Sequence, residues 1–303
     1  MSSTLSRTPP SAIRRKLREE VGFGCPVEGC GSPYLSYHHF DPPWNIQPHH
    51  NPEGMIALCL QHHKEADKGA FTPKQLREMK KHPYLKEIKR FPKGRFNWKR
   101  EQFLLLVGGN WYIKPKVILK LKEKKIIWLS KDTDGFEQIN LDIYDFQGNI
   151  ILNMRNNDWL IHASIDDLEC PPSGNSLKIK VKSHNVWINL SFSQFSKEEL
   201  YKKVESLHQK AYRNMKKQKK TWPKNEWTQR ILESVEFKDE QTRRTFGYIC
   251  ENIKEETITL CTLQGHLVWP VDISLNETCT ILPGQNIITG CLMVNVGIGL
   301  KIA

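Results

Sequence analysis

The pattern of apolar and polar residues changes at about residue 100. Beyond that point short runs rich in Ile, Val, Leu and Trp recur, several of them alternating with polar residues, for example "KVILKLKEKKIIWL", "INLDIYDF" and "LKIKV". Turn sequences such as "DTDG" and "FQGN" separate these runs, which is typical of antiparallel strands. We therefore predict a β-rich domain over residues 101–303.

One long helix interrupts the strands of this domain. Within residues 196–220 the apolar positions recur at three- and four-residue spacing, and Ser196 with Glu199 forms a capping box at the start. A shorter helix is predicted nearer the N-terminus, where Thr72 is a good capping residue and Pro73 suits the first helical position. The expected fold class is α+β.

The first 90 residues have a different composition. Residues 25–70 are rich in Cys, His, Pro and Gly, and the segment is too short to bury an apolar core of its own. We predict a small metal-stabilised domain over residues 1–90, joined by a basic linker at 91–100 to the β-rich domain.

Charge points to a class of partner. The 303 residues carry a net charge of +12, and residues 1–100 hold 18 Lys+Arg against 9 Asp+Glu. Residues 195–230 form a second basic block, with 11 against 4. Two basic blocks favour a polyanion as partner, most simply nucleic acid. Because the chain has neither a secretory signal nor an apolar run of roughly 20 residues, we expect a cytoplasmic protein without membrane contact.

Two close pairs of metal-binding residues stand out in the first domain. Cys25 and Cys30 form one pair, and Cys59 and His62 form the other. Three thiolates and one imidazole are a usual donor set for tetrahedral Zn²⁺. A segment without its own core can gain its folding free energy from such an ion. We predict a structural zinc site.

Five further histidines lie in the same segment. His38 and His39 are adjacent in the strand-like sequence "YLSYHHF", so their side chains should point to opposite faces. His63 follows His62 at the start of a predicted helix, where neighbouring side chains diverge by about 100°. The zinc would therefore bring His63 close to the strand of His38 and His39. His49 and His50 receive no firm role.

Taken in order, these features resemble the HNH endonucleases, the ββα-metal nucleases, in the subgroup that a zinc ion braces. The resemblance covers about residues 20–72: a cysteine pair, "HH" on a strand, a loop, "IALC", and a histidine pair that opens a helix. It implies that His39 is the general base and that His38 and His63 bind a catalytic Mg²⁺ or Mn²⁺. The zinc ligands that it implies are Cys25, Cys30, Cys59 and His62.

One position departs from the family's pattern, and the role of another residue, Asp67, is open. The family's middle asparagine normally falls near Gly54, and we expect Asn51 to take its place, with His50 as the alternative. Asp67 could hydrogen-bond a metal-binding histidine, although an exposed helix carboxylate is the more ordinary outcome.

The function implied by the resemblance is metal-dependent hydrolysis of DNA phosphodiester bonds. A histidine with a pKa of about 6.5 suits the removal of a proton from water, and a divalent ion acts as the Lewis acid. We expect the DNA backbone to be held by basic residues on the flanks of the site. These are Arg14, Arg15, Lys16, Lys74 and Arg77.

Such nucleases often serve in restriction or phage defence, so residues 101–303 would bind an activating ligand or partner protein, or recognise the substrate. Two other functions remain open. One is a zinc-stabilised nucleic-acid-binding module without catalysis, and the other is a nuclease with RNA as its substrate.

Overall fold

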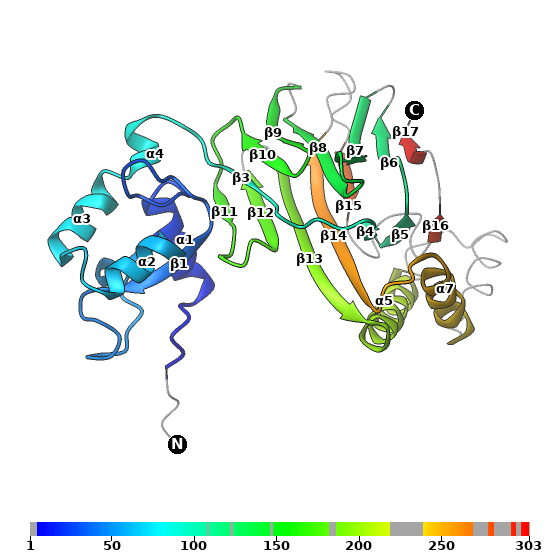
Figure 1. Cartoon of the computed structure of the whole chain (residues 1–303), viewed down its shortest axis with the longest axis horizontal. Helices are drawn as coiled ribbons and strands as arrows, with labels where there is room; N and C mark the ends of the chain where they lie inside the picture. Colours follow the sequence, from blue (N-terminus) through cyan, green and yellow to red (C-terminus); the bar gives the residue numbers. More distant parts are fainter. Residues whose placement is uncertain are drawn as a thin grey trace.

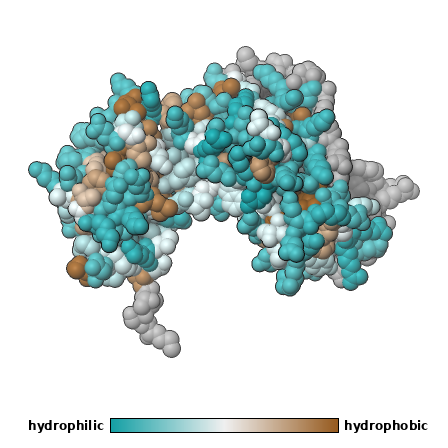
Figure 2. Space-filling model, in the orientation of Figure 1, coloured by the Kyte–Doolittle hydropathy of each residue, from teal (hydrophilic) through white to brown (hydrophobic). Residues whose placement is uncertain are grey.

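The computed structural model has a smaller helical part at the N-terminus and a larger part built mostly of strands (Figure 1). This mixed α+β class, with strands predominating, is the one expected. The face shown in Figure 2 is mostly hydrophilic and is hollowed between the two parts. The structure describes residues 5–107, 109–121, 124–145, 148–181, 186–218, 239–268, 278–281, 292–294 and 298–302.

The N-terminal part is built around one two-stranded sheet. Its strands pair antiparallel, with Leu35 opposite Cys59 and His39 opposite Met55. In chain order its elements are α1 (Ser11–Glu20), β1 (Leu35–His39), the 3₁₀ helix η1 (Pro52–Gly54), β2 (Met55–Cys59), α2 (Leu60–Asp67), α3 (Pro73–Lys81) and α4 (Tyr84–Glu87).

Strand β2 lies at the centre of this part. Its sequence, "MIALC", is apolar throughout, and all five residues are buried, with α1 and α2 packed nearby. Leu17 of α1 and Leu76 of α3 complete the core. Burial of each large apolar side chain contributes about 1.5–3 kcal/mol. The predicted cap of α3 is present: the Thr72 hydroxyl accepts a hydrogen bond from the Gln75 N–H.

The β-rich part is one extensive sheet in which β13 and β14 form the longest pairing. Most neighbours are antiparallel, as predicted, but β14 pairs in parallel with β4, as β16 does with β5 and β17 with β6. The strands are β3 (Lys93–Arg95), β4 (Leu104–Val107), β5 (Asn110–Ile113), β6 (Val117–Leu121), β7 (Lys124–Lys131), β8 (Glu137–Tyr144), β9 (Ile150–Arg155), β10 (Asp158–Ile161), β11 (Asp167–Glu169), β12 (Ser176–Val181), β13 (Val186–Ser196), β14 (Thr257–Val268), β15 (Thr278–Ile281), β16 (Leu292–Val294) and β17 (Ile298–Ile302).

Helices α5 (Lys197–Gln218) and α7 (Asp239–Asn252) pack together near one end of β13 and β14 (Figure 1). The predicted capping box of α5 is present, because the Ser196 N–H donates to the Glu199 carboxylate at 2.8 Å and the Glu199 N–H donates to Ser196 Oγ at 3.2 Å. The second basic block continues beyond α5, and residues 219–238 lie outside the described residues.

Part of the segment interpreted as a linker, β3, belongs to the β-rich sheet. Strand β3 pairs with β10, and Phe96, which follows it, is 1% exposed in the main core. Gly94 lies against the Trp159 ring so closely that a Cβ there would be 2.5 Å from it. The basic residues on either side of Gly94 lack the apolar pattern of a buried strand. Only three residues of β3 pair with β10, so this strand is identified by its tertiary packing and could not be predicted from the sequence.

Within the described residues, no helix has both the length and the apolar character that a membrane span requires.

Candidate metal centres and active site

The first cluster joins the cysteine-containing loop before β1 to the start of α2. The four donor atoms of Cys25, Cys30, Cys59 and His62 all lie within 4.8 Å of one another. His62 Nδ1 is 3.3 Å from Cys25 Sγ and 3.2 Å from Cys59 Sγ, and Cys30 Sγ is 3.9 Å from Cys59 Sγ. The sequence prediction named these four residues, and their arrangement could bind a metal ion.

The loop that carries Cys25 and Cys30 is held by its own backbone. The Cys25 N–H donates to the Ser32 carbonyl, and the Gly31 N–H donates to the Cys25 carbonyl. Gly31 has φ +61°, and a Cβ there would lie 2.7 Å from Leu85. Burial raises the pKa values of Cys25 and Cys30. A nearby cation would be needed to keep such thiols ionised, which is the form that binds metals.

A second cluster lies between β1 and α2. His38 Nδ1 is 3.0 Å from Asp67 Oδ1, and His63 Nε2 is 3.7 Å from the same oxygen. The two imidazole rings meet edge to face, with centroids 5.1 Å apart. The side chain of Asp67 is 47% exposed, so the cluster opens to solvent on that side. Two imidazoles and a carboxylate could bind a divalent ion.

The sequence prediction placed His38 and His63 together but not Asp67 as a third donor. The signal was the four-residue spacing of His63 and Asp67, which places them on one face of α2. Burial lowers the pKa values of His38 and His63, although Asp67 acts in the opposite direction. Neutral imidazoles are the form that binds a metal ion.

Ser36 fixes which nitrogen of His63 faces this cluster. The Ser36 hydroxyl donates to the Leu58 carbonyl at 3.1 Å and is 2.7 Å from His63 Nδ1. Because its one proton is already used, the hydroxyl accepts from Nδ1–H. His63 Nε2 therefore carries the free lone pair and points towards Asp67 and His38.

His39 makes its contacts away from the second cluster, as expected for neighbouring residues on a strand. Its ring packs against Trp44, with centroids 4.7 Å apart, and against His49, with centroids 5.2 Å apart. The residue is 4% exposed, and neither ring nitrogen has a hydrogen-bond partner among the described residues. Burial, together with the charge of His49, lowers the pKa of His39 to about 4.

Comparison with known proteins gives no assignment. No family model matches the chain, and no similar protein is found among the curated proteins or the solved structures. Any assignment of function therefore depends on the geometry of the chain's own residues.

The loop between β1 and β2 is braced by His49. Its Nδ1 accepts from the Asn51 N–H at 3.0 Å, so its Nε2–H donates to the Pro42 carbonyl at 2.8 Å. Asn51, predicted as the substitute for the family's asparagine, uses its side-chain oxygen to accept from the Glu53 N–H and cap η1. Bracing across the loop therefore comes from His49, for which the sequence indicated no role.

No side chain fits at Gly54 in this backbone. Its carbonyl accepts hydrogen bonds from the N–H groups of Phe40 and Asp41 at 2.9 and 3.2 Å. A Cβ at Gly54 would lie 1.8 Å from the Asp41 carbonyl oxygen. The close approach of the two chain segments therefore excludes an asparagine at this position.

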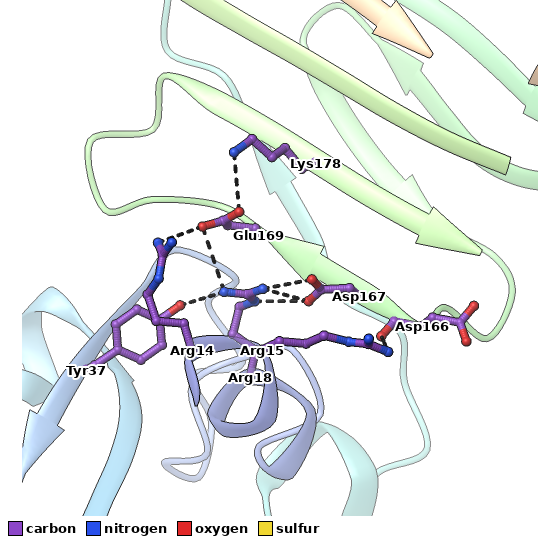
Figure 3. A network of polar contacts seen from close by, with 8 residues as sticks. All are labelled: Arg14, Arg15, Arg18, Tyr37, Asp166, Asp167, Glu169 and Lys178. Carbon is purple, nitrogen blue, oxygen red and sulfur yellow. Dashed lines mark hydrogen bonds and ion pairs between the residues drawn. The ribbon is translucent and has the colours of Figure 1, made fainter. Parts of the chain in front are cut away.

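The arginines of α1 have partners in the β-rich part, which was not predicted. Figure 3 shows Arg14, Arg15 and Arg18 directed at β11 and the residue before it. Arg14 pairs with Glu169 at 3.0 Å, and Arg15 donates to the Asp166 carbonyl at 3.3 Å. The guanidinium groups of Arg14 and Arg15 thus join the two parts of the molecule, and their contact with DNA stays a prediction.

The other predicted DNA contacts differ in their surroundings. The Lys16 ammonium nitrogen lies 3.9 Å from a carboxylate oxygen of Glu20 and 3.6 Å from one of Glu53. Arg77 pairs with Asp41 and lies over the Phe40 ring, 5.5 Å from its centroid. Lys74 is exposed on α3. Lys74 and Arg77 remain candidates for contact with a polyanion.

A cleft of about 580 Å³ lies where the two parts meet. Cys30 and Cys59 line it from the N-terminal part, and Arg95, Trp98 and Ser173 line it from the β-rich part. Neither His39 nor the second cluster lines this cleft, so it is separate from the candidate catalytic residues.

Proposed function

We propose that this chain is a metal-dependent endonuclease of the HNH type that hydrolyses phosphodiester bonds of DNA. The observation that carries the proposal is that β1 holds His39 next to His38, and that His38 lies in a cluster of possible metal ligands. His39 and His38 lie next to each other on β1, and their side chains contact different neighbours. His38 belongs to the donor cluster with His63 and Asp67. If these residues act as proposed, a proton acceptor and a cation site would lie side by side, an arrangement that suits phosphodiester hydrolysis.

The first cluster would hold Zn²⁺ and fix the fold around the site. For zinc with bonds of about 2.3 Å to sulfur and about 2.0 Å to nitrogen, a regular tetrahedron has edges of roughly 3.8 Å between sulfurs and roughly 3.5 Å between sulfur and nitrogen. The observed edges are 3.9 Å for Cys30–Cys59 and 3.2–3.3 Å for the two contacts of His62. The donor set therefore fits. It would join the loop of Cys25 and Cys30 to α2, which carries His63.

The second cluster would hold Mg²⁺ or Mn²⁺ through His38, His63 and Asp67. When bound, the ion would supply Lewis-acid stabilisation of the phosphate and the leaving oxygen. Asp67 adds the hard oxygen ligand that both ions prefer. Ser36 keeps the lone pair of His63 Nε2 directed at the cluster. His39, with both nitrogens unpaired in the described structure, would accept the proton of the attacking water.

Plasmid cleavage tests this proposal. Supercoiled DNA is incubated with purified protein in Mg²⁺, in Mn²⁺ and in chelator, and a structured RNA is incubated in parallel. We expect nicking or linearisation of the DNA that requires the added ion. Cleavage of the RNA alone would change the assigned substrate. Ion-independent binding of nucleic acid without cleavage would instead support the alternative, a zinc-stabilised binding module.

The β-rich part would control when or where the nuclease acts, through an activating ligand or a partner protein. Its support is the direct link between the parts, in which Asp167 and Glu169 bind arginines of α1 (Figure 3). A role in restriction or antiviral defence would fit this arrangement. Lysate from phage-infected cells, added to the cleavage assay, tests it: a rise in cleavage is expected, and an unchanged rate would count against activation.

A further inference from the structure

The N-terminal segment before α1 lies against the loop of the candidate site. His50 Nε2 is 2.8 Å from the carbonyl oxygen of Ser6, so its N–H donates to that oxygen. The His50 ring also stacks on Trp44, with centroids 5.9 Å apart, and Trp44 packs on His39. On its other side the segment leads through Pro10 directly into α1. Arg7 is therefore held between two anchors, next to the site.

The charge of Arg7 acts on all the candidate catalytic histidines. Burial is the main cause that lowers the pKa values of His38, His39 and His63, and the positive charge of Arg7 lowers each of them further. The His50 ring that holds the segment lies 6.3 Å from the His39 ring, centroid to centroid, so the segment lies beside the candidate proton acceptor. This agrees with the position that the His50–Ser6 hydrogen bond gives the segment.

Arg7 differs from the arginines of α1 in its partners. Arg14 and Arg18 pair with carboxylates of β11, whereas Arg7 is exposed and has no ion pair with a carboxylate among the described residues. With a divalent ion in the second cluster, two positive charges would face the same space. Such an arrangement favours an anion between them, and a planar guanidinium matches the oxygens of a phosphate.

We propose that Arg7 binds the phosphate of the nucleic acid at the second cluster, and that His50 positions Arg7 by holding the N-terminal segment. The inference rests on the proposed function and adds the residue that contacts the substrate anion. It also gives His50 a role other than the one the sequence suggested, as the alternative to Asn51.

Binding is measured in a way that does not depend on cleavage. Fluorescence anisotropy of a short DNA duplex with Mn²⁺ is recorded in a His39→Ala background, so that the DNA stays intact. We expect Arg7→Ala to weaken binding about tenfold and to reduce the slope of log affinity against log salt by about 0.9, the value for one phosphate contact. Arg7→Lys should recover part of the affinity. Arg243→Ala, which removes an exposed arginine from α7 outside both basic blocks, serves as the matched control and should leave the affinity unchanged.

The role of His50 is tested by a double-mutant cycle. His50→Ala should weaken binding in the presence of Arg7 and have no further effect in an Arg7→Ala background, because it acts through that residue. Additive losses would overturn the positioning role. The affinity for Mn²⁺ should not fall in Arg7→Ala, since the variant removes a like charge and no ligand.

The outcomes separate the two proposals. In single-turnover cleavage by the chain with His39 intact, Arg7→Ala should slow the reaction about 10²- to 10³-fold, as expected when one donor to the developing charge is lost. Equal DNA affinity with and without Arg7 would overturn the inference even if the wild type cuts DNA. If the wild type binds DNA through Arg7 but never cleaves it, the proposed nuclease function is wrong and the inference about Arg7 stands. Absence of any DNA binding would overturn both.

Discussion

Arg18 is the residue whose loss should most disturb the contact between the two parts of the molecule. It is 4% exposed, and its guanidinium donates to the Asp167 carboxylate at 2.8, 2.9 and 3.1 Å and to the Tyr37 hydroxyl at 2.8 Å. Tyr37 immediately precedes His38 on β1. The substitution Arg18→Met keeps most of the apolar side chain and removes every one of these hydrogen bonds.

The expected loss follows from the burial of the partners. Removing one member of a buried ion pair costs about 3–5 kcal/mol, because the other charge is left without a partner. Asp167 retains 22% of its side-chain exposure and can regain some hydration, so we expect about 3 kcal/mol in the free energy of unfolding for Arg18→Met. Arg15→Met is the matched control, since Arg15 donates to a backbone carbonyl at 3.3 Å, and it should cost less than about 1 kcal/mol.

Urea-induced unfolding, followed by circular dichroism, measures both variants. Asp167→Asn and the double variant complete a cycle, in which we expect a coupling energy of at least about 1.5 kcal/mol between Arg18 and Asp167. A loss of less than about 1 kcal/mol for Arg18→Met, or strictly additive single losses, would refute the view that this pair holds the two parts together.

Three further results are expected. Asp67→Asn should weaken Mn²⁺ binding at least about tenfold by calorimetric titration, and unchanged affinity would remove Asp67 from the ligand set. Cys59→Ser should lose the bound zinc, measured by elemental analysis, and unfold the N-terminal part; full zinc content with native circular dichroism would contradict the first site. Burial raises the pKa of Glu137 from 4.5 to about 7, so its contribution to stability is full below about pH 4.5 and is lost as the pH rises through 7. Glu137→Gln, whose oxygen can still accept from the Phe103 N–H, should exceed the wild type in unfolding free energy by about 2–4 kcal/mol at pH 8.5 and by little at pH 4.5.

The parts of the site that could be predicted depend on local spacing. Close pairs such as Cys25 with Cys30 and Cys59 with His62 restrict the geometry before any tertiary contact forms, and the structure brings them together. Helix caps such as Thr72 are equally local, since the partner lies three residues away.

The remaining features depend on contacts that are distant in sequence. Arg14 and Glu169 are 155 positions apart, so the basic residues of α1 looked like a free surface. Asp67 becomes a third donor only because the pairing of β1 with β2 brings His38 beside α2. Gly54 could not be understood until the close approach of Asp41 was known. Of these residues only Asp67 carries a local signal, its four-residue spacing from His63; the other contacts have none in the sequence around either partner.

The rate of DNA cleavage by His39→Ala, relative to the wild type, tests the central claim most directly. Supercoiled plasmid is incubated with excess protein in Mn²⁺, zinc content is determined for each preparation, and His82→Ala, whose side chain is 67% exposed, serves as the histidine control. We predict that His39→Ala cleaves at least about 10²-fold more slowly, while it retains one zinc per chain and His82→Ala cleaves at the wild-type rate. Equal rates for His39→Ala and the wild type would contradict the assignment of the proton acceptor and, with it, the proposed nuclease site.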